Sequence, residues 1–144
     1  MNSTYPNLME IYTHSIKQAP FEGVRKSRWA IITRTWKNLK AIIQIWQDLF
    51  PSHVCAIDWS SPVRGHLVQK LGDGTTIDLD ILFLALDKPE NVDQILSLEL
   101  TAAWIEDPQN LPTKTIEALT PRIGRYPRRQ LGGPTWYGII NGND

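Results

Sequence analysis

Residues 81–107 of this 144-residue chain read ILFLALDKPENVDQILSLELTAAWIED. The segment opens with a wholly apolar run, which is typical of a strand buried on both faces of a sheet. A proline and a glutamate then suit the first turn of a short helix, residues 89–97. A second apolar run, residues 100–105, predicts another buried strand that ends at two adjacent carboxylates, Glu106 and Asp107. Strand, helix and strand in this order predict a unit of an α/β fold.

The same alternation continues on both sides of this segment. Residues 7–18 and 37–49 carry apolar side chains at helical spacing, and the run RWAIIT at 28–33 predicts a strand between them. Downstream, residues 112–120 predict a short helix and TWYGII at 135–140 predicts a last strand. We therefore expect an α/β layer fold with a mostly parallel sheet.

A β-hairpin is predicted in the middle of the chain. HLVQKL at 66–71 and TIDLDILFLAL at 76–86 flank a GDGT turn. In the second strand Asp78 and Asp80 alternate with apolar residues, which predicts one face in contact with solvent. These aspartates could bind a cation, but a solvated strand face is the favoured interpretation. Residues 53–63 are ambiguous.

Composition excludes several classes of protein. No apolar run approaches the roughly 20 residues needed to cross a bilayer, and the N-terminus lacks the pattern of a signal peptide. We therefore expect a soluble intracellular protein without membrane contact. The single cysteine, Cys55, excludes an internal disulfide and suits a small buried apolar residue better than a nucleophile.

The charge is zero overall but unevenly distributed. Residues 1–47 hold seven Lys or Arg and two Glu, a net of +5; residues 48–117 hold four Lys or Arg and twelve acids, a net of −8. Residues 118–144 hold four Arg and one Asp, a net of +3. Either the two basic ends fold together into one positive face or these are ordinary solvated surfaces, and the sequence alone leaves both open.

Two sets of residues are candidates for chemistry. In nucleotide hydrolysis one acid holds the metal and a second orients the attacking water, so Glu106 and Asp107 are the catalytic candidates. Four arginines then lie within eight residues, and their guanidinium forks can bind phosphate oxygens of DNA or a nucleotide: Arg122, Arg125, Arg128 and Arg129. The alternatives are an ordinary strand exit for the acids and a solvated basic loop for the arginines.

A second basic cluster flanks the predicted strand at 28–33, with the same two interpretations: Arg25, Lys26, Arg28 and Arg34.

Three long stretches together resemble the ATPase domain of bacteriophage terminase large subunits, the motors that package phage DNA. They are LMEIYTHSIKQAPFEGVRKSRWAIITRTWKNLK at 8–40, LFLALDKPENVDQILSLELTAAWIED at 82–107 and RIGRYPRRQLGGPTWYGII at 122–140. The resemblance implies a partial P-loop NTPase layer fold of the RecA/ASCE-like type, with a mostly parallel sheet and a β-hairpin insertion. Residues 1–144 would be a single domain, a fragment of the terminase ATPase domain.

The resemblance also implies roles for individual residues. Residues 100–105 would be the Walker B strand, with Asp107 in place of the catalytic glutamate and Glu106 as the metal-side acid. Thr4 would be a Mg²⁺ ligand and Arg34 would contact the nucleotide. The Glu-Asp order departs from the family's Asn-Glu or Asp-Glu. It sets the second carboxylate back by roughly 1.5 Å, and a misplacement of about 1 Å can cost on the order of 100-fold in rate.

A larger departure concerns the phosphate-binding loop. The family's Gly-Lys-Ser/Thr would fall on Asn2, Ser3 and Thr4, where only Thr4 matches, and no glycine-rich phosphate loop occurs in the sequence. Because Ser3 cannot supply the charge that phosphoryl transfer needs, we expect no independent ATPase activity. The chain would be a prophage remnant or one piece of a split gene. The alternatives are a non-catalytic module that binds DNA or a motor protein, and a small standalone ATPase.

The cofactors and partners follow from the resemblance alone. They are Mg²⁺ and ATP, or no cofactor for this chain by itself, with double-stranded DNA, the small terminase subunit and the portal as partners. The location would be the cytoplasm of a bacterial host cell. Because the phosphate-loop strand is central in such a sheet, its loss would expose two strand edges to pairing. Either the remaining strands close the gap, or the chain self-associates by oligomerisation or aggregation.

Overall fold

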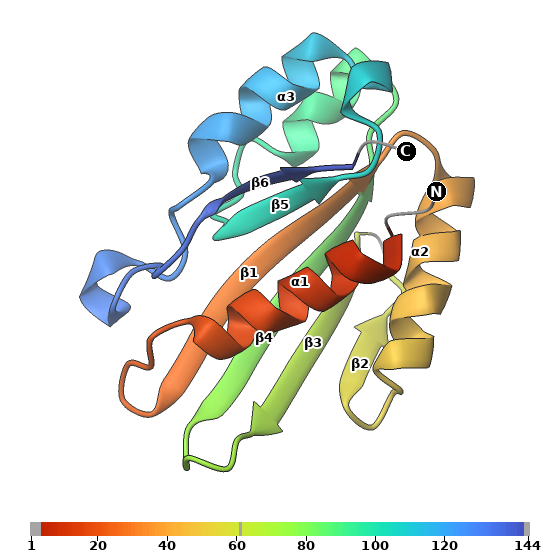
Figure 1. The fold of residues 1–144 in the computed structure, drawn as a ribbon. Helices are drawn as coiled ribbons and strands as arrows, with labels where there is room; N and C mark the ends of the chain where they lie inside the picture. Colours follow the sequence, from red (N-terminus) through yellow and green to blue (C-terminus); the bar gives the residue numbers. More distant parts are fainter. Residues whose placement is uncertain (1–3, 61, 143–144) are drawn as a thin grey trace.

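A computed structural model describes residues 4–60 and 62–142, and the strands in these ranges form one six-stranded sheet (Figure 1). The strand order is β2-β3-β4-β1-β5-β6. Strand β1 is parallel to β4 and β5, and β5 is parallel to β6, whereas β3 is antiparallel to β2 and β4. The strands are β1 (Val24–Thr33), β2 (Cys55–Asp58), β3 (Val63–Lys70), β4 (Thr76–Ala85), β5 (Ala102–Ile105) and β6 (Gly138–Asn141). The mostly parallel α/β sheet with a β-hairpin is confirmed.

Helices cover both faces of the sheet. Helices α1 (Thr4–Lys17) and α2 (Trp36–Leu49) lie on one face, and α3 (Thr113–Leu119) lies on the other with the 3₁₀ turn η1 (Pro89–Gln94). Three further single turns of 3₁₀ helix occur: η2 (Pro108–Asn110), η3 (Thr120–Arg122) and η4 (Arg129–Leu131). The helix predicted at 89–97 is therefore a short 3₁₀ turn. No described helix combines the length and apolar character that a membrane span requires.

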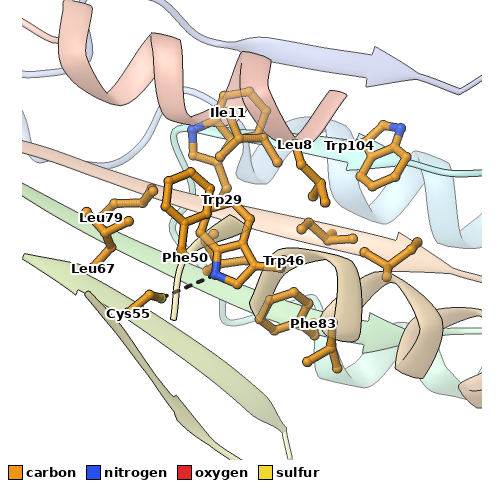
Figure 2. Close-up of a cluster of buried hydrophobic side chains, with 14 of the residues drawn as sticks. Leu8, Ile11, Trp29, Trp46, Phe50, Cys55, Leu67, Leu79, Phe83 and Trp104 are labelled. Atoms are coloured by element: carbon orange, nitrogen blue, oxygen red, sulfur yellow. Dashed lines mark hydrogen bonds between the residues drawn. The ribbon is translucent and has the colours of Figure 1, made fainter. Parts of the chain in front are cut away.

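The larger core lies between the sheet and helices α1 and α2 (Figure 2). Helix α2 begins at the N-cap Thr35, whose hydroxyl accepts a hydrogen bond from the Asn38 amide at 3.2 Å. Its apolar face buries Trp46, and the indole Nε1 donates to Cys55 Sγ at 3.3 Å. Burial raises the pKa of the Cys55 thiol above its ordinary value. Cys55 is thus a buried, protonated residue of the core.

The opposite face of the sheet is covered over only part of its length. A smaller apolar cluster joins η1 and α3 to residues in the carboxyl-terminal halves of β1 and β4. Nearer the amino end of β4 the same face is charged: His66 lies 2.7 Å from Asp78, and Asp80 pairs with arginines. This is the solvated strand face that the alternation predicts, with both aspartates paired to basic side chains of this chain.

The sheet has no internal gap. Strand β1 pairs with β4 along its whole length and with β5 on its other edge, and within the described residues only β2 and β6 are edge strands. The remaining strands therefore close the gap, one of the two outcomes considered for the sheet, because β4, β1, β5 and β6 follow one another as hydrogen-bonded neighbours. The ambiguous residues 53–63 contain β2 and lead into β3.

The turn between β3 and β4 is held by one carboxylate. Asp73 Oδ1 accepts hydrogen bonds from the Thr75 hydroxyl at 2.6 Å and the Thr75 amide at 2.9 Å, and Arg25 lies 3.0 Å from its second oxygen. These contacts, the Thr75 hydroxyl first, lower the pKa of Asp73 to about 2.

We expect the Asp73→Ala substitution to lower stability in a pH-dependent way. A depressed pKa contributes stability above the unfolded value, near 3.9, and loses it as the pH falls through about 2. The difference in urea midpoint between wild type and variant should be full at about pH 5 and shrink toward about pH 2. A difference that stays constant over this range would contradict the role of the carboxylate.

The exit of β6 packs tightly on the exit of β5. The Gly142 amide donates to the Ile105 carbonyl at 2.7 Å. A Cβ at position 142 would lie 2.5 Å from the carbonyl oxygen of Glu106 and 3.1 Å from Nε1 of Trp104. Because the first of these is a backbone atom, a side chain here requires the backbone to move.

The Gly142→Ala substitution should therefore reduce the free energy of unfolding by about 1–3 kcal/mol through overpacking. Gly72→Ala is a matched control, because no heavy atom lies within 4 Å of its added Cβ. Urea denaturation of both variants measures the effect, and equal midpoints for the two would show that the β6 exit adapts freely.

Candidate functional site

The carboxyl ends of the parallel strands meet at one edge of the sheet. Strand β5 leads to Glu106, whose amide donates to the Ile32 carbonyl of β1 at 2.9 Å. Strand β6 ends beside them at Gly142, and α1 begins at the same end of the sheet (Figure 1). In open α/β sheets this edge is the usual place for a ligand.

A hydrogen bond connects the side chain of Glu106 to helix α2. This half-buried side chain accepts a hydrogen bond from Asn38 Nδ2 at 3.3 Å, in the first turn of α2. The N-terminus of a helix carries a partial positive charge, which stabilises a carboxylate placed there. The Thr33 hydroxyl donates to the Thr35 carbonyl at 2.9 Å and so fixes the step from β1 into α2.

Asp107 is held by the turn that follows it. Its Oδ2 accepts from Asn110 Nδ2 at 2.6 Å, and its carbonyl accepts from the Asn110 amide at 3.1 Å. The two adjacent carboxylates therefore have different partners, one on α2 and one on η2. In residues 4–60 and 62–142 no group of three or more His, Cys, Asp or Glu side chains could hold a metal. Two carboxylates with water ligands suit Mg²⁺, which keeps much of its hydration shell.

The two predicted nucleotide contacts lie at this edge as well. Thr4 is the buried first residue of α1, and Arg34 is an exposed side chain directly after β1. Asn2 and Ser3, on which the phosphate-loop positions would fall, lie outside the described residues. Gly142 is a residue of this edge that the sequence analysis missed. The only local signal for it was a glycine after an apolar strand.

The predicted arginine loop lies toward the other end of the sheet, before β6 (Figure 1). The Leu100 amide, at the entry to β5, donates to the Arg122 carbonyl at 3.0 Å, and the Arg125 amide donates back to the Leu100 carbonyl at 2.9 Å. The structure therefore does not bring the acidic pair and these arginines together.

Gln18, the residue that follows α1, forms two hydrogen bonds with the end of the loop near β6. Gln18 Nε2 donates to the Gly133 carbonyl at 2.9 Å, and Gln18 Oε1 accepts from the Thr135 amide at 2.9 Å. The ring of Trp136 stacks on His14 of α1, with a centroid distance of 3.8 Å. The loop is thus anchored on both β5 and α1.

The loop arginines surround an open pocket of about 720 Å³. Arg125, Arg128 and Arg129 are exposed on its lining, and Arg128 Nε lies 3.4 Å from Glu99 Oε1. Arg122 is half-buried and donates to the Leu96 carbonyl at 3.0 Å.

The two basic ends of the sequence also meet where an arginine of the first lies over an aromatic ring of the last. The guanidinium of Arg28, from the first basic third, lies 4.0 Å from the ring centroid of Tyr126, from the last. Acids interrupt the positive surface there, because Asp80 and Glu99 pair with the nearby arginines. Burial raises the pKa of the Tyr126 hydroxyl above its ordinary value, and the nearby Arg28 opposes this.

No protein-family model matches the sequence, and the search of curated proteins gives no match. Solved structures do match the fold. The large terminase of a thermophilic bacteriophage in complex with ATP-gamma-S gives a TM-score of 0.64 at 12% identity, over 98% of this chain and 30% of that chain. Its complex with ADP gives 0.60 at 12% identity, over 94% and 38%.

A further crystal form of that large terminase gives a TM-score of 0.58 at 13% identity, over 82% of this chain and 26% of that chain. This chain therefore spans between 26% and 38% of the length of the matched chains. At such low identity the likeness concerns the fold alone. The chain has a mixed α/β fold that resembles part of the large terminase of this thermophilic phage.

Proposed function

We propose that this chain is an ATPase-domain fragment of a phage DNA-packaging terminase and does not hydrolyse ATP by itself. The observation that carries the proposal is the position of Glu106 and Asp107, at the carboxyl end of β5 in a sheet whose fold is similar to a large terminase. That terminase has been solved with ADP and with ATP-gamma-S. Double-stranded DNA, the small terminase subunit, the portal and other copies of this chain are the proposed partners.

The residues at the edge have complementary roles in this proposal. Glu106 holds Mg²⁺ through its carboxylate, and Asn38 keeps that carboxylate oriented from α2. When bound, the metal neutralises charge on the phosphate oxygens. Thr4 adds a hydroxyl ligand, and Arg34 reaches the phosphates from the end of β1. Asp107 orients water, although its bond to Asn110 draws one oxygen toward η2.

Hydrolysis needs more than this edge supplies. Phosphoryl transfer depends on a backbone cradle and a lysine that position and neutralise the β and γ phosphates. The sequence contains no glycine-rich loop followed by lysine. We therefore propose that catalysis requires groups beyond these 144 residues.

Titration with a fluorescent ATP analogue tests whether the sheet edge that carries Glu106 and Asp107 binds a nucleotide. We expect weak, Mg²⁺-dependent binding that falls on the order of tenfold in Glu106→Gln, because this removes the charge that holds the metal. The loss should be smaller in Asp107→Asn, because that carboxylate orients water. Asp48→Asn, an exposed acid on α2, is the control and should bind like wild type. Phosphate release from ATP should stay at the level of buffer.

Two outcomes would count against this assignment. If the analogue does not bind, or if its affinity is independent of Mg²⁺ and unchanged by both substitutions, this edge is not a nucleotide site. Steady turnover by the purified chain would show instead that it is a standalone ATPase.

The arginine loop favours a second candidate function, a non-catalytic module that binds DNA. Three exposed arginines project from a loop fixed to β5 and α1, so their guanidinium groups are presented on a rigid support: Arg125, Arg128 and Arg129. Such groups bind the phosphate backbone without reading sequence.

Fluorescence anisotropy with duplex DNA tests this candidate. Arg125→Gln/Arg129→Gln should weaken binding for every sequence alike and reduce the slope of log K against log salt by about 2. Lys37→Gln/Lys40→Gln at the start of α2 removes the same charge at the other end of the sheet and should leave the slope near that of wild type. An equal loss of DNA affinity in both double variants would mean that binding depends on the net charge of the protein and not on the arginine loop.

A further inference from the structure

We infer that the uncovered part of the sheet carries a binding site for a phosphate group, built by arginines from three separate segments. Arg28 comes from β1, Arg64 from β3, and two others from the segment before β6. All four line one pocket of about 490 Å³: Arg28, Arg64, Arg122 and Arg128. The local sequence gives no sign of this grouping, because the four positions are spread from residue 28 to residue 128.

Ion pairs fix three of the guanidinium groups. Arg28 and Arg64 both donate to Asp80 Oδ2, each at 3.2 Å. Arg28 Nη1 also donates to the Glu99 carbonyl at 3.3 Å, and the side chain of Glu99 accepts from Arg128 Nε at 3.4 Å. A continuous chain of charged groups therefore runs along the pocket wall from β3 to the loop.

The ring of Tyr126 holds Arg28 in place. Its centroid lies 4.0 Å from the guanidinium carbon, a distance at which the ring attracts a cation. The Thr101 hydroxyl donates to the Tyr126 carbonyl at 2.6 Å and accepts from the Arg28 amide at 3.0 Å. Arg28 is thus fixed before any ligand arrives, which reduces the ordering that binding requires.

Arg122 is fixed at the pocket wall by a backbone carbonyl. Its Nη1 donates to the Leu96 carbonyl at 3.0 Å, but its Nε is buried and has no hydrogen-bond partner among the described residues. Buried donors are almost always paired, and Arg122 Nε is one of the few buried side-chain atoms of the described residues that are not.

The charge balance selects the class of ligand. Four arginines line the pocket and two carboxylates, Asp80 and Glu99, pair with them, so the local net charge is +2. The neighbouring Asp78 is hydrogen-bonded to His66, and this pair is neutral only when His66 is protonated. A phosphate monoester or inorganic phosphate carries about −1.5 to −2 at neutral pH, which matches this excess, and its oxygens suit guanidinium forks. A phosphodiester carries a single negative charge and matches less well.

The pocket walls strengthen the attraction. Pro62, Leu82 and Leu98 form apolar parts of the lining, and Leu82 is only 4% exposed. Charges beside low-dielectric walls interact more strongly than charges in open water. The site involves neither Glu106 nor Asp107, so it does not rest on the proposed nucleotide edge.

Isothermal titration with sodium phosphate, against sodium chloride of equal ionic strength, tests the inference. We expect saturable binding of one phosphate per chain and at least about a tenfold loss of affinity in Arg64→Gln/Arg122→Gln. Arg122→Lys keeps the charge but lacks the planar fork. It should therefore bind phosphate less tightly than wild type and more tightly than the double variant. Lys37→Gln/Lys40→Gln lowers the net charge equally on the opposite face and should bind like wild type.

Urea midpoints confirm that each variant is folded before it is compared. No saturable phosphate binding, or an equal loss in the control, would overturn the inference. Duplex DNA in a parallel titration separates the two sources of a phosphate group. DNA binding that depends on Arg64 and Arg122, without binding of free phosphate, would assign the pocket to the polymer backbone and overturn the site for a dianion.

Discussion

The carboxyl-terminal half of β1 is hydrogen-bonded along both edges and buried on both faces, and the neighbouring strands and helices pack around it. The strand pairs with β4 over its whole length and with β5 over its carboxyl-terminal half. From Trp29 to Thr33 every side chain is fully buried. A parallel strand in this position cannot alternate apolar with polar residues, which is why the segment reads as a continuous apolar run. The bulky Trp29 faces α1 and α2, whereas the small Ala30 faces the thinner layer of η1 and α3.

The register of β5 against β1 determines where the candidate chemistry lies. Strand β5 has four residues, all buried and apolar in type, so charged and hydroxyl side chains occur only where the chain enters and leaves it. At the entry, the Thr101 hydroxyl accepts from the Arg28 amide at 3.0 Å; at the exit, the Glu106 amide donates to the Ile32 carbonyl at 2.9 Å. Both ends of the short strand are therefore tied to β1.

Burial leaves a periodic trace in the sequence, and the elements with a buried face were predictable for that reason. Helices α1 and α2 and the hairpin show this period, whereas the strand before Glu106 shows a continuous apolar run because both of its faces are buried. Strand β2 does not, because it is a short edge strand with an exposed alanine and aspartate. The segment at 89–97 has the composition of a helix start, but only a 3₁₀ turn fits between β4 and β5.

The candidate site was predictable only in part. The position of Glu106 and Asp107 followed from the rule that parallel strands end at one edge. The contacts that place the arginines join residues far apart in the chain: Gln18 and Gly133, for example, are 115 positions apart. No local pattern records such a contact. Nor does a pattern reveal that Gly142 is required by the carbonyl of Glu106, because that requirement arises from the packing of two strand exits.

The distance between the two ends of β5 limits what the loop arginines can do. From Thr101 to Glu106 the strand rises by roughly 16 Å, at about 3.3 Å per residue. The Debye length at physiological ionic strength is about 8 Å, so charges at one end are largely screened from the other. The loop arginines, anchored at Thr101 through Gly124 and Tyr126, therefore cannot neutralise a phosphate beside Glu106. Among the arginines assigned from the sequence, only Arg34 lies at the acidic edge. The two ends are connected instead by paired strands and by α1, which begins at the acidic edge and is followed by Gln18, which bonds to the arginine loop.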